Sequence, residues 1–467
     1  MDGDAGPVVA NNPRTISVYL TVKNAGTSSL PFGEFSTPVD GTTGITGAIP
    51  VTGWVIDDVE VTRVEVKRDP HSSDPTGAIG PDGLVFIGYG IFVEGARPDI
   101  ETSYPGFPLN YRAGWGYMLL TNFLPSGGNG TYRLHAFAYD KEGNPTLLGS
   151  KSITCDNAHA TKPFGTIDTP EQGGDSAGNP YLNFGWVLTP MTKTVPKDGS
   201  TIDVFVDSVK VGNLATAPNM YDQYRVDVAT AFPGLNNSGG PVGAFFLNTT
   251  AYPNGVHTIH WIATDDAGAA DGIGSRYFNI VNTGTPIQNG DMYFGDMYLR
   301  DTSSRRIGDT RSLGAPDLSA KSQREERSDV AISKIEDILN LPMTFEPLRV
   351  KQGFDLKADP VSVAPDNFGV YRVEIPEVNR LEIGVASTIG REKVKNGDAT
   401  PILSGYMIVG EELRPLPIGS TLDACTGTFS WMPGPGFVGE YKMVFVAKDG
   451  FGAMRRIPLN VKIVPKR

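Results

Sequence analysis

The sequence predicts an all-β fold made of several β-sandwich domains, and three observations lead to this prediction. Its 467 residues are too many for one hydrophobic core and suggest roughly three or four domains. Its 56 glycines and 36 prolines lie between short β-branched and aromatic runs, which is typical of turn-rich β proteins. One pattern, NGTYRLHAFAYDKEGN at 129–144, returns as NGVHTIHWIATDDAGA at 254–269 and more loosely as VGEYKMVFVAKDGFGA at 438–453.

The recurring pattern reads as a strand followed by a tight turn. Apolar residues occupy alternate positions, which indicates a strand with one face buried against a second sheet. In the first copy these positions are Tyr132, Leu134, Ala136 and Ala138. An aspartate then starts each turn, at Asp140, Asp265 and Asp449, because Asp accepts hydrogen bonds from backbone amides two residues on. A further strand follows, so each pattern predicts a closing hairpin.

The hairpin belongs to a larger duplication. PFGEFSTPVDG at 31–41 returns as PFGTIDTPEQG at 163–173, and RPDIETSYPG at 97–106 returns as RVDVATAFPG at 225–234. The spacing between equivalent positions changes by only a few residues, as expected when loop lengths differ between two copies of one unit. The chain therefore contains two related units.

A terminal hairpin whose first strand begins with Tyr is typical of immunoglobulin-like sandwiches, where that Tyr forms the tyrosine corner. Tyr132 and Tyr441 fit, whereas His257 in the second copy leaves this bond in doubt. With PFGTIDTP, GW, YRVDVATAFPG and NGVHTIHWIATDDAG, residues 31–155 and 163–282 resemble bacterial immunoglobulin-like repeats of large secreted or surface proteins of soil bacteria. LPIGSTLDACTGTFSWMPGPGFVGEYKMVFVAKDG at 416–450 is similar to immunoglobulin- or cadherin-like domains of bacterial exoproteins.

The predicted fold is thus a series of tandem immunoglobulin-like sandwiches with a partly helical linker before the C-terminal domain. The expected segments are an orphan strand and linker at 1–30, repeats at 31–155 and 163–282, a linker at 283–344 and a C-terminal sandwich at 345–467. TISVYLTVKN in the first segment reads as the last strand of a domain whose earlier part is missing. We expect the chain to be a piece of a longer secreted protein, with its domains arranged end to end as a rod.

The linker at 283–344 contains one predicted helix. Its apolar stripe, ended by Pro342, consists of Val330, Ile332, Ile335, Ile338 and Leu339. We expect this helix to dock on its own chain, and a helix that binds a partner is the alternative.

Composition and motifs argue against several functions. A net charge of −12 argues against nucleic acid, no run of 18 apolar residues could span a membrane, and the N-terminus lacks the features of a signal peptide. Cys155 and Cys425 are expected to be free thiols, and Cys155 with His159 falls short of a zinc site. No catalytic motif is present, and His135 and His260 share one column of the repeat, so we expect structural roles for both and no enzyme.

Two kinds of binding site remain as candidates. Calcium is the candidate cofactor at the hairpin turns, although the same residue types also hold turns together. Its candidate ligands are Asp140, Glu142, Asp265, Asp266 and Asp271. An Arg–Asp pair in each repeat is the candidate ligand corner, with polysaccharide as its candidate ligand because aromatic faces stack on sugars.

The residues of this ligand corner are Arg97, Asp99, Tyr111 and Trp115 in the first copy and Tyr221, Tyr224, Arg225 and Asp227 in the second. The alternative is an Arg–Asp brace that holds a long loop over Tyr104 or Phe232.

The expected function is that of a non-catalytic structural or adhesive module at the surface of a bacterium or outside it. Three alternatives stay open: the accessory C-terminal region of a secreted hydrolase, a carbohydrate-binding module, and a strand-exchange subunit of an extracellular filament. In the filament, TISVYLTVKN or an exposed sheet edge would pair with another copy or another protein, because unpaired strand edges accept a neighbouring strand.

Overall fold

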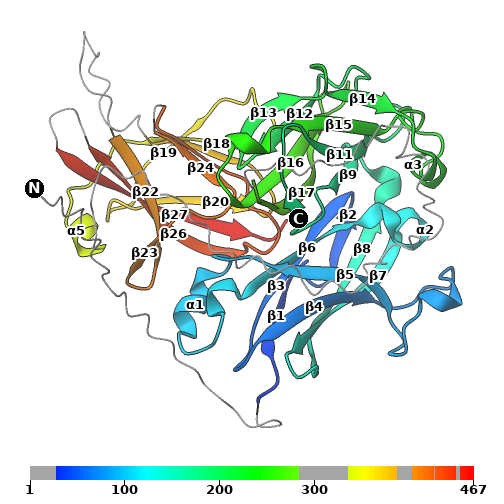
Figure 1. Ribbon diagram of the computed structural model, residues 1–467, viewed down its shortest axis with the longest axis horizontal. Helices are drawn as coiled ribbons and strands as arrows, with labels where there is room; N and C mark the ends of the chain where they lie inside the picture. The colour runs from blue at the N-terminus through cyan, green and yellow to red at the C-terminus, as the bar shows by residue number, and fades with distance from the viewer. Residues whose placement is uncertain (1–27, 283–334, 386–401, 425, 449–452, 467) are drawn as a thin grey trace, which may run out of the picture.

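The computed structural model describes residues 28–282, 335–385, 402–424, 426–448 and 453–466. Within them the protein is all-β and consists of tandem β-sandwiches, as the sequence predicts. We call its three units repeat 1 (β1–β8), repeat 2 (β9–β17) and the C-terminal unit (α5 and β18–β27) (Figure 1). The predicted strand TISVYLTVKN and the helix residues Val330 and Ile332 lie outside the described residues.

Repeat 1 is one eight-stranded sheet, in the order β1-β3-β6-β5-β4-β7-β8-β2, which folds over a shared core. Its strands are β1 Phe32–Thr37, β2 Thr42–Ile45, β3 Ala48–Ile56, β4 Val61–Arg68, β5 Val85–Phe92, β6 Gly114–Leu120, β7 Asn129–Asp140 and β8 Pro145–Asp156. Its short helices are α1 Pro98–Ser103 and α2 Pro125–Gly128. The alternating residues of β7 face the core, which confirms the predicted period of two.

Repeat 2 has two sheets, in the orders β10-β17-β16-β12-β13 and β14-β15-β11-β9. Its elements are β9 Phe164–Thr169, β10 Asp175–Ser176, β11 Tyr181–Leu188, β12 Ile202–Val206, β13 Val209–Asn213, β14 Met220–Gln223, α3 Val226–Ala231, β15 Val242–Leu247, β16 Gly255–Thr264 and β17 Ala270–Ile280. Strand β16 is buried along most of its length, and its Thr258 lies against Gly419 of the C-terminal unit.

The C-terminal unit has two five-stranded sheets, in the orders β19-β18-β21-β25-β24 and β20-β27-β26-β22-β23. Its elements are α5 Ile335–Leu339, β18 Leu348–Gln352, β19 Val361–Val363, β20 Tyr371–Pro376, β21 Leu381–Gly384, β22 Ile402–Val409, β23 Glu412–Arg414, β24 Ser420–Asp423, β25 Thr428–Trp431, β26 Gly439–Lys448 and β27 Met454–Val464. Ile338 of α5 packs against Val444 and Val446, so the described part of the predicted helix is docked on its own chain. No helix among the described residues is both long and apolar enough to cross a membrane.

The first residue column of the closing hairpin anchors each unit differently. The Tyr132 hydroxyl donates to the carbonyl of Pro125, which is the tyrosine-corner bond. His257 cannot form the tyrosine-corner bond in repeat 2; its Nε2 instead lies 2.9 Å from the carbonyl of Pro253, four residues upstream, whereas Pro125 is seven residues upstream of Tyr132. The Tyr441 hydroxyl instead accepts from the backbone amide of Arg97, 3.3 Å away in repeat 1.

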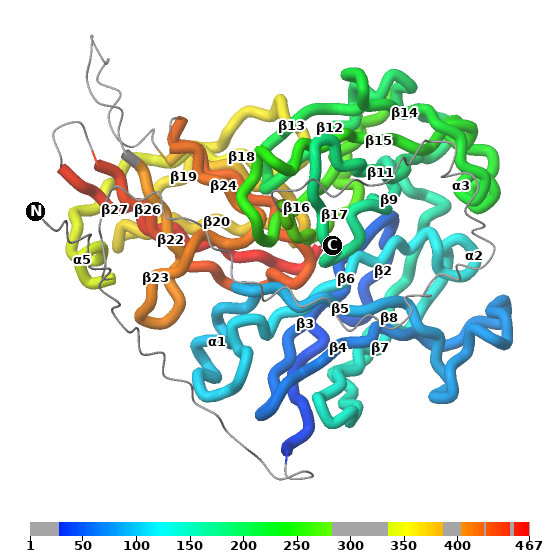
Figure 2. The backbone as a smooth tube through the Cα atoms, viewed as in Figure 1, coloured from blue at the N-terminus to red at the C-terminus, as the bar shows by residue number. Residues whose placement is uncertain are grey.

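The predicted end-to-end rod is wrong, because the C-terminal unit packs against both repeats (Figures 1 and 2). The segment at Pro435 and Gly436 is seated between them, since the Pro435 carbonyl accepts from the Tyr277 hydroxyl of repeat 2 and its backbone lies against Gly116 of repeat 1. Buried Ser208 of repeat 2 donates to the Gly419 carbonyl and accepts from the Met432 amide, both at 2.6 Å. The three units therefore form one compact block.

Candidate functional site

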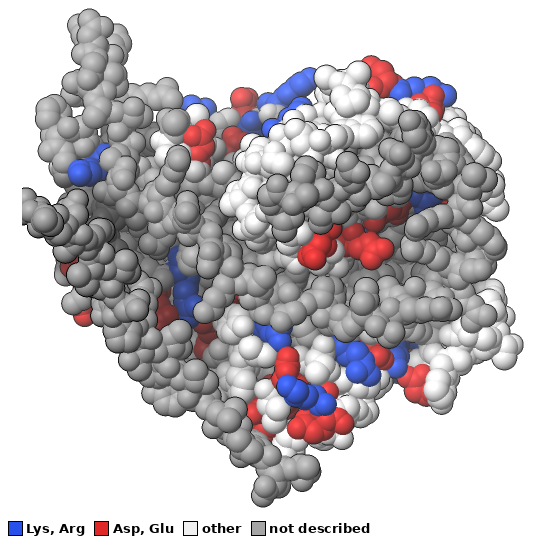
Figure 3. Space-filling view, viewed as in Figure 1, with Lys and Arg blue, Asp and Glu red and all other residues white. Residues whose placement is uncertain are grey.

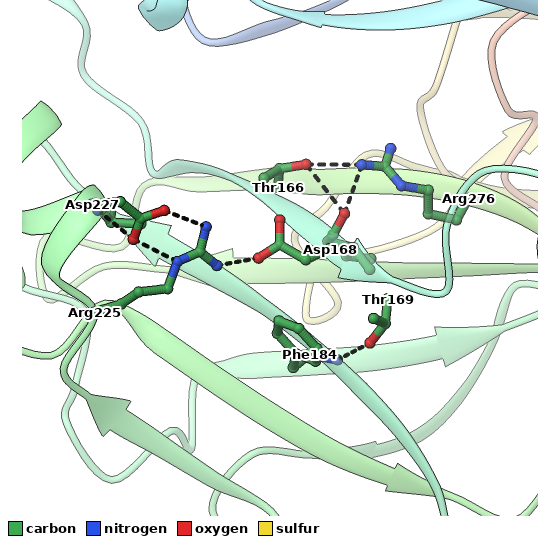
Figure 4. A network of polar contacts seen from close by, with 9 residues as sticks. Thr166, Asp168, Thr169, Phe184, Arg225, Asp227 and Arg276 are labelled. Atoms are coloured by element: carbon green, nitrogen blue, oxygen red, sulfur yellow. Dashed lines mark hydrogen bonds and ion pairs between the residues drawn. The ribbon is translucent and has the colours of Figure 1, made fainter. Parts of the chain in front are cut away.

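The two Arg–Asp pairs occupy equivalent positions, each with its arginine directly before the first residue of a short helix. In repeat 2, Arg225 precedes α3, and its guanidinium bonds Asp227 at 2.7 Å and also Asp168 of β9 (Figure 4). The side chains of Arg225 and Asp168 are each 26% exposed. Arg225 therefore ties the loop before α3 to a strand of the sandwich, which is the geometry of a brace.

A second arginine lies beside this brace. Arg276 of β17 donates to the Thr166 hydroxyl at 3.0 Å and to the Ile167 carbonyl at 2.6 Å (Figure 4). Burial raises the pKa of Asp168, and Arg225 opposes this effect. Burial acts in the same direction on Asp227, but the hydrogen bonds and charge of Arg225 outweigh it and leave the pKa of Asp227 lowered. The brace thus depends on the positive charge of Arg225.

In repeat 1, Arg97 precedes α1 and pairs with Asp99 at 2.7 Å, in a position where the Asp99 side chain is 42% exposed. No second carboxylate is bonded to Arg97 among the described residues. The guanidinium carbon instead lies 5.9 Å from the ring centre of Trp54, close enough for a cation–π contact. The repeat 1 corner therefore lacks the second carboxylate of repeat 2, and its arginine is more buried, with the Arg97 side chain 11% exposed against 26% for Arg225.

The structure does not gather the predicted aromatic residues at these corners. Trp115 is fully buried in the core of repeat 1, and Tyr221 is 4% exposed with its hydroxyl donating to the Val187 carbonyl. Tyr111 is half-buried, and Tyr224 is exposed. Burial removes Trp115 and Tyr221 from any surface site.

Other aromatic rings, which the sequence reasoning did not assign to a site, surround both corners. In repeat 1, Trp54 and Tyr104 are stacked at 5.8 Å, and Phe32 and Phe107 pack edge-on against Tyr104. We call these four side chains the aromatic face of repeat 1. Their signal in the sequence was the repeat itself, since each unit carries Phe in PFG, Trp in GW, and Tyr or Phe before Pro-Gly.

The equivalent rings in repeat 2 are Phe164, Trp186 and Phe232. They lie 5.3 to 6.1 Å apart. Phe232 follows α3 and packs against the cluster that also contains Val228 of this helix. The repeat 2 corner therefore has the geometry of a brace, whereas in repeat 1 Arg97 bonds only Asp99, two residues along the chain.

The candidate calcium ligands lie in or beside the hairpin turns, and four of the five accept hydrogen bonds from backbone amides. Asp140 accepts from the Asn144 amide at 2.7 Å, and Asp265 accepts from the Ala267 and Ala269 amides and from the Thr189 hydroxyl. Such bonding is how Asp stabilises a turn.

The remaining candidate calcium ligands do not converge with these two. Glu142 is exposed, Asp266 accepts from the Thr194 amide, and Asp271 lies 3.8 Å from the Lys466 ammonium group. Within the described ranges, no three His, Cys, Asp or Glu side chains form a group suited to a metal ion.

The histidines of the shared column have structural surroundings. His135 lies between Asp69, 2.8 Å away, and Ser150, 2.7 Å away. His260 is fully buried and stacks on Phe205, and burial lowers its pKa to about 3. Burial raises the pKa of Cys155 to about 12, so this thiol is protonated and unreactive at neutral pH. Cys425 and Asp449 lie outside the described residues.

Charged side chains are paired across much of the surface. On the face drawn in Figure 3, side chains of both signs lie next to each other over repeat 1. Lys67 bonds Asp82 at 2.7 Å and Glu65 at 2.9 Å. These pairs neutralise one another locally instead of forming a single-sign patch there.

No protein-family model matches the chain, and no curated protein matches it. Solved structures similar to it include the fibronectin(III)-like modules of Clostridium thermocellum CbhA, with 14% identity over 54% of this chain and 95% of that one and a TM-score of 0.17. A tetra-tandem repeat from the extending region of a large adhesion protein is 12% identical over 93% of this chain and 75% of that one, with a TM-score of 0.17. Latent dimeric PorU from Porphyromonas gingivalis is 12% identical over 93% of this chain, with a TM-score of 0.19. The chain spans only 34% of the length of PorU. These scores are too low to carry an inference about function.

Proposed function

We propose that this chain is a non-catalytic structural module of a secreted or cell-surface bacterial protein, in which three sandwiches act as one fixed block. The main observation behind the proposal is that Pro435 and Gly436 of the C-terminal unit contact both repeats. A block held in this way sets the positions and directions of whatever is attached to it. This is the work of a spacer or of an adhesive scaffold.

The contacts between units support a fixed arrangement. Ser208 is 1% exposed and bonds two backbone groups of the C-terminal unit, and Thr421 donates to the Asp207 carbonyl at 2.7 Å. On the other side, Arg414 bonds Glu101 of α1 at 2.8 Å. Each of these polar groups is paired across a boundary between units. Separating the units would break these hydrogen bonds, and sliding one unit over another would leave the groups buried without a partner, which is costly.

The extracellular location is supported by the resemblance of the repeat motifs to secreted and surface proteins. A role without catalysis is supported by the Arg225 brace, by the hydrogen bonds of His135 and by the burial of His260 against Phe205. Turnover of a polysaccharide or peptide by the purified chain would contradict the proposal.

The fixed block is tested by spin-label distance measurements on the full chain. Labels at Glu142→Cys of repeat 1 and Phe368→Cys of the C-terminal unit, both exposed positions, are introduced with Cys425→Ser, while buried Cys155 stays unlabelled. We expect one narrow distance distribution, as narrow as that of a control pair at Phe368 and Glu411 within one unit. A broad distribution would mean that the units move independently. Fractionation of the source cells with an antibody to this chain tests the location.

A further inference from the structure

The aromatic clusters of the two repeats differ in what covers them. In repeat 2, Phe123 of repeat 1 lies 5.9 Å from Trp186 and 5.4 Å from Phe232, and Leu120 packs against the same cluster. Phe164 is consequently only 6% exposed and Trp186 only 1%. The segment 120–123, at the end of β6 and before α2, therefore caps the aromatic cluster of the unit that follows it, with Phe123 itself 44% exposed.

The aromatic face of repeat 1 has Phe32, Trp54 and Tyr104 at the equivalent positions and a fourth ring, Phe107, where repeat 2 has Leu235, and no ring of a neighbouring unit lies against it among the described residues. Phe32, the equivalent of Phe164, is 37% exposed, and Trp54, Tyr104 and Phe107 are each partly exposed. In the part of the chain that the structure describes, the aromatic partners of these four rings are one another. Trp54 also contacts the Arg97 guanidinium, and Trp54, Tyr104 and Phe107 pack against Ile56, Ile100 and Ala113. A cluster of large apolar side chains left open in this way marks an interaction surface.

We propose that the aromatic face of repeat 1 is the docking site for another sandwich unit of the same kind, placed N-terminal to residue 31 in the same polypeptide. That unit would insert a Leu-x-x-Phe loop like 120–123 of repeat 1. In repeat 2 the cap comes from the unit immediately before it, across the short connection from β8 to β9. By analogy, the unit that covers the aromatic face of repeat 1 would precede β1 in the sequence.

A second copy of this chain fits the face less well. Its own Phe123 is already used against its own repeat 2. The equivalent short turn of repeat 2, Thr249–Ala251, has Ala251 where Thr121–Phe123 of repeat 1 has Phe123. A copy therefore has no free loop with the matching phenylalanine among its described residues. This inference rests on the repeat geometry alone and goes beyond the fixed block proposed above.

The chain carries its own probe for this face. Of its five tryptophans, four are fully buried, and Trp54 is partly exposed. Quenching of tryptophan fluorescence by acrylamide in the full chain therefore reports on Trp54, with Trp54→Phe as the background. In the test variant, a second copy of residues 31–162, itself carrying Trp54→Phe, is placed before residue 31 of the full chain.

If the proposal is right, the added unit protects Trp54 from acrylamide. Quenching of the tandem should then equal that of the same tandem with Trp54→Phe in both copies. The matched control carries Phe123→Ser in the added copy alone, where Phe123 has no partner inside its own unit's core. This control should restore the quenching. Equal quenching in both variants would overturn the proposal, as would protection of Trp54 by soluble polysaccharide but not by the added unit.

A second measurement does not depend on the folding of the engineered tandem. A natural polypeptide in which such a unit precedes residue 31 should show Trp54 protected from acrylamide. Exposure of Trp54 to the same extent as in the present chain would overturn the proposal. Phe123→Ser in the present chain serves as a positive control, because it should uncover Trp186 and increase quenching.

Discussion

The carboxylate of Glu377 in the C-terminal unit accepts a hydrogen bond from the Thr52 hydroxyl of repeat 1, 3.1 Å away across a buried boundary. Glu377 is 1% exposed, and its other oxygen has no hydrogen-bond partner among the described residues. Burial raises the pKa of Glu377 from its ordinary value of 4.5 to about 7. This boundary therefore favours the protonated, neutral acid.

The contact predicts a loss of stability as the pH rises. Below pH 4.5 the group is protonated in the folded and unfolded states alike, and between 4.5 and about 7 only the unfolded state loses its proton. The free energy of unfolding should fall across this window by about 3 kcal/mol, and above it the penalty stays constant. Urea unfolding at pH 5 and pH 8 measures the change.

Glu377→Gln should abolish this part of the pH dependence, since an amide stays neutral and still accepts from Thr52. Glu374→Gln on the same strand is the control, because its partner Lys462 and Glu374 itself are both more than half exposed. An unchanged pH dependence in Glu377→Gln would show that another group causes it.

Gly116 predicts a steric test of the same interface. A Cβ at this position would lie 2.3 Å from the Pro435 carbonyl carbon, and backbone cannot move aside as a flexible side chain does. Gly116→Ala should lower the free energy of unfolding by about 1–3 kcal/mol and broaden the spin-label distances between repeat 1 and the C-terminal unit. Gly106→Ala is the matched control, since no atom lies within 4 Å of its Cβ. Equal effects of both substitutions would argue against close packing at Pro435.

The internal repeat made much of the structure predictable from sequence. The alternation in β7 identified a face that is buried, and the column of Asp140 and Asp265 identified turns that these side chains do hold together. Pairing Arg97 with Arg225 located two real corners. Such features follow from local periodicity and hydrogen bonding within one unit, which the order of residues shows directly.

Contacts between units were not predictable in this way. Gly116, Pro435 and Gly436 read as turn or strand residues, and nothing in their order shows that they meet across an interface. Glu377 reads as a solvated turn residue, although it is buried. Trp115 and Trp54 are both aromatic residues near the candidate corner, and only the folded arrangement shows that the first belongs to the core and the second to the surface.

The tyrosine corner of repeat 1 gives a third prediction. Tyr132→Phe removes the hydroxyl that donates to the Pro125 carbonyl and should lower the free energy of unfolding by about 1 kcal/mol. Tyr224→Phe removes a hydroxyl from a residue that is 50% exposed and should change stability far less. Thermal unfolding of both variants gives the comparison. Similar losses in the two would mean that the corner bond contributes nothing specific.

The two Arg–Asp corners should differ in their contribution to stability, although their sequences match. Arg225→Met leaves Asp168 and Asp227 without their cation, and burial already disfavours the charge on Asp168, so we expect a loss of about 2 kcal/mol. Arg97→Met keeps the apolar stem over Trp54 and leaves only Asp99, which is 42% exposed, so the loss should stay below about 1 kcal/mol.

The measurement that separates the two corners is urea unfolding at neutral pH, repeated near pH 3, where protonation of the carboxylates should narrow the difference between the variants. Asp168→Asn combined with Arg225→Met should recover part of the loss, because it removes the uncompensated charge. Equal losses for Arg97→Met and Arg225→Met would show that the contact with Asp168 adds nothing to the brace.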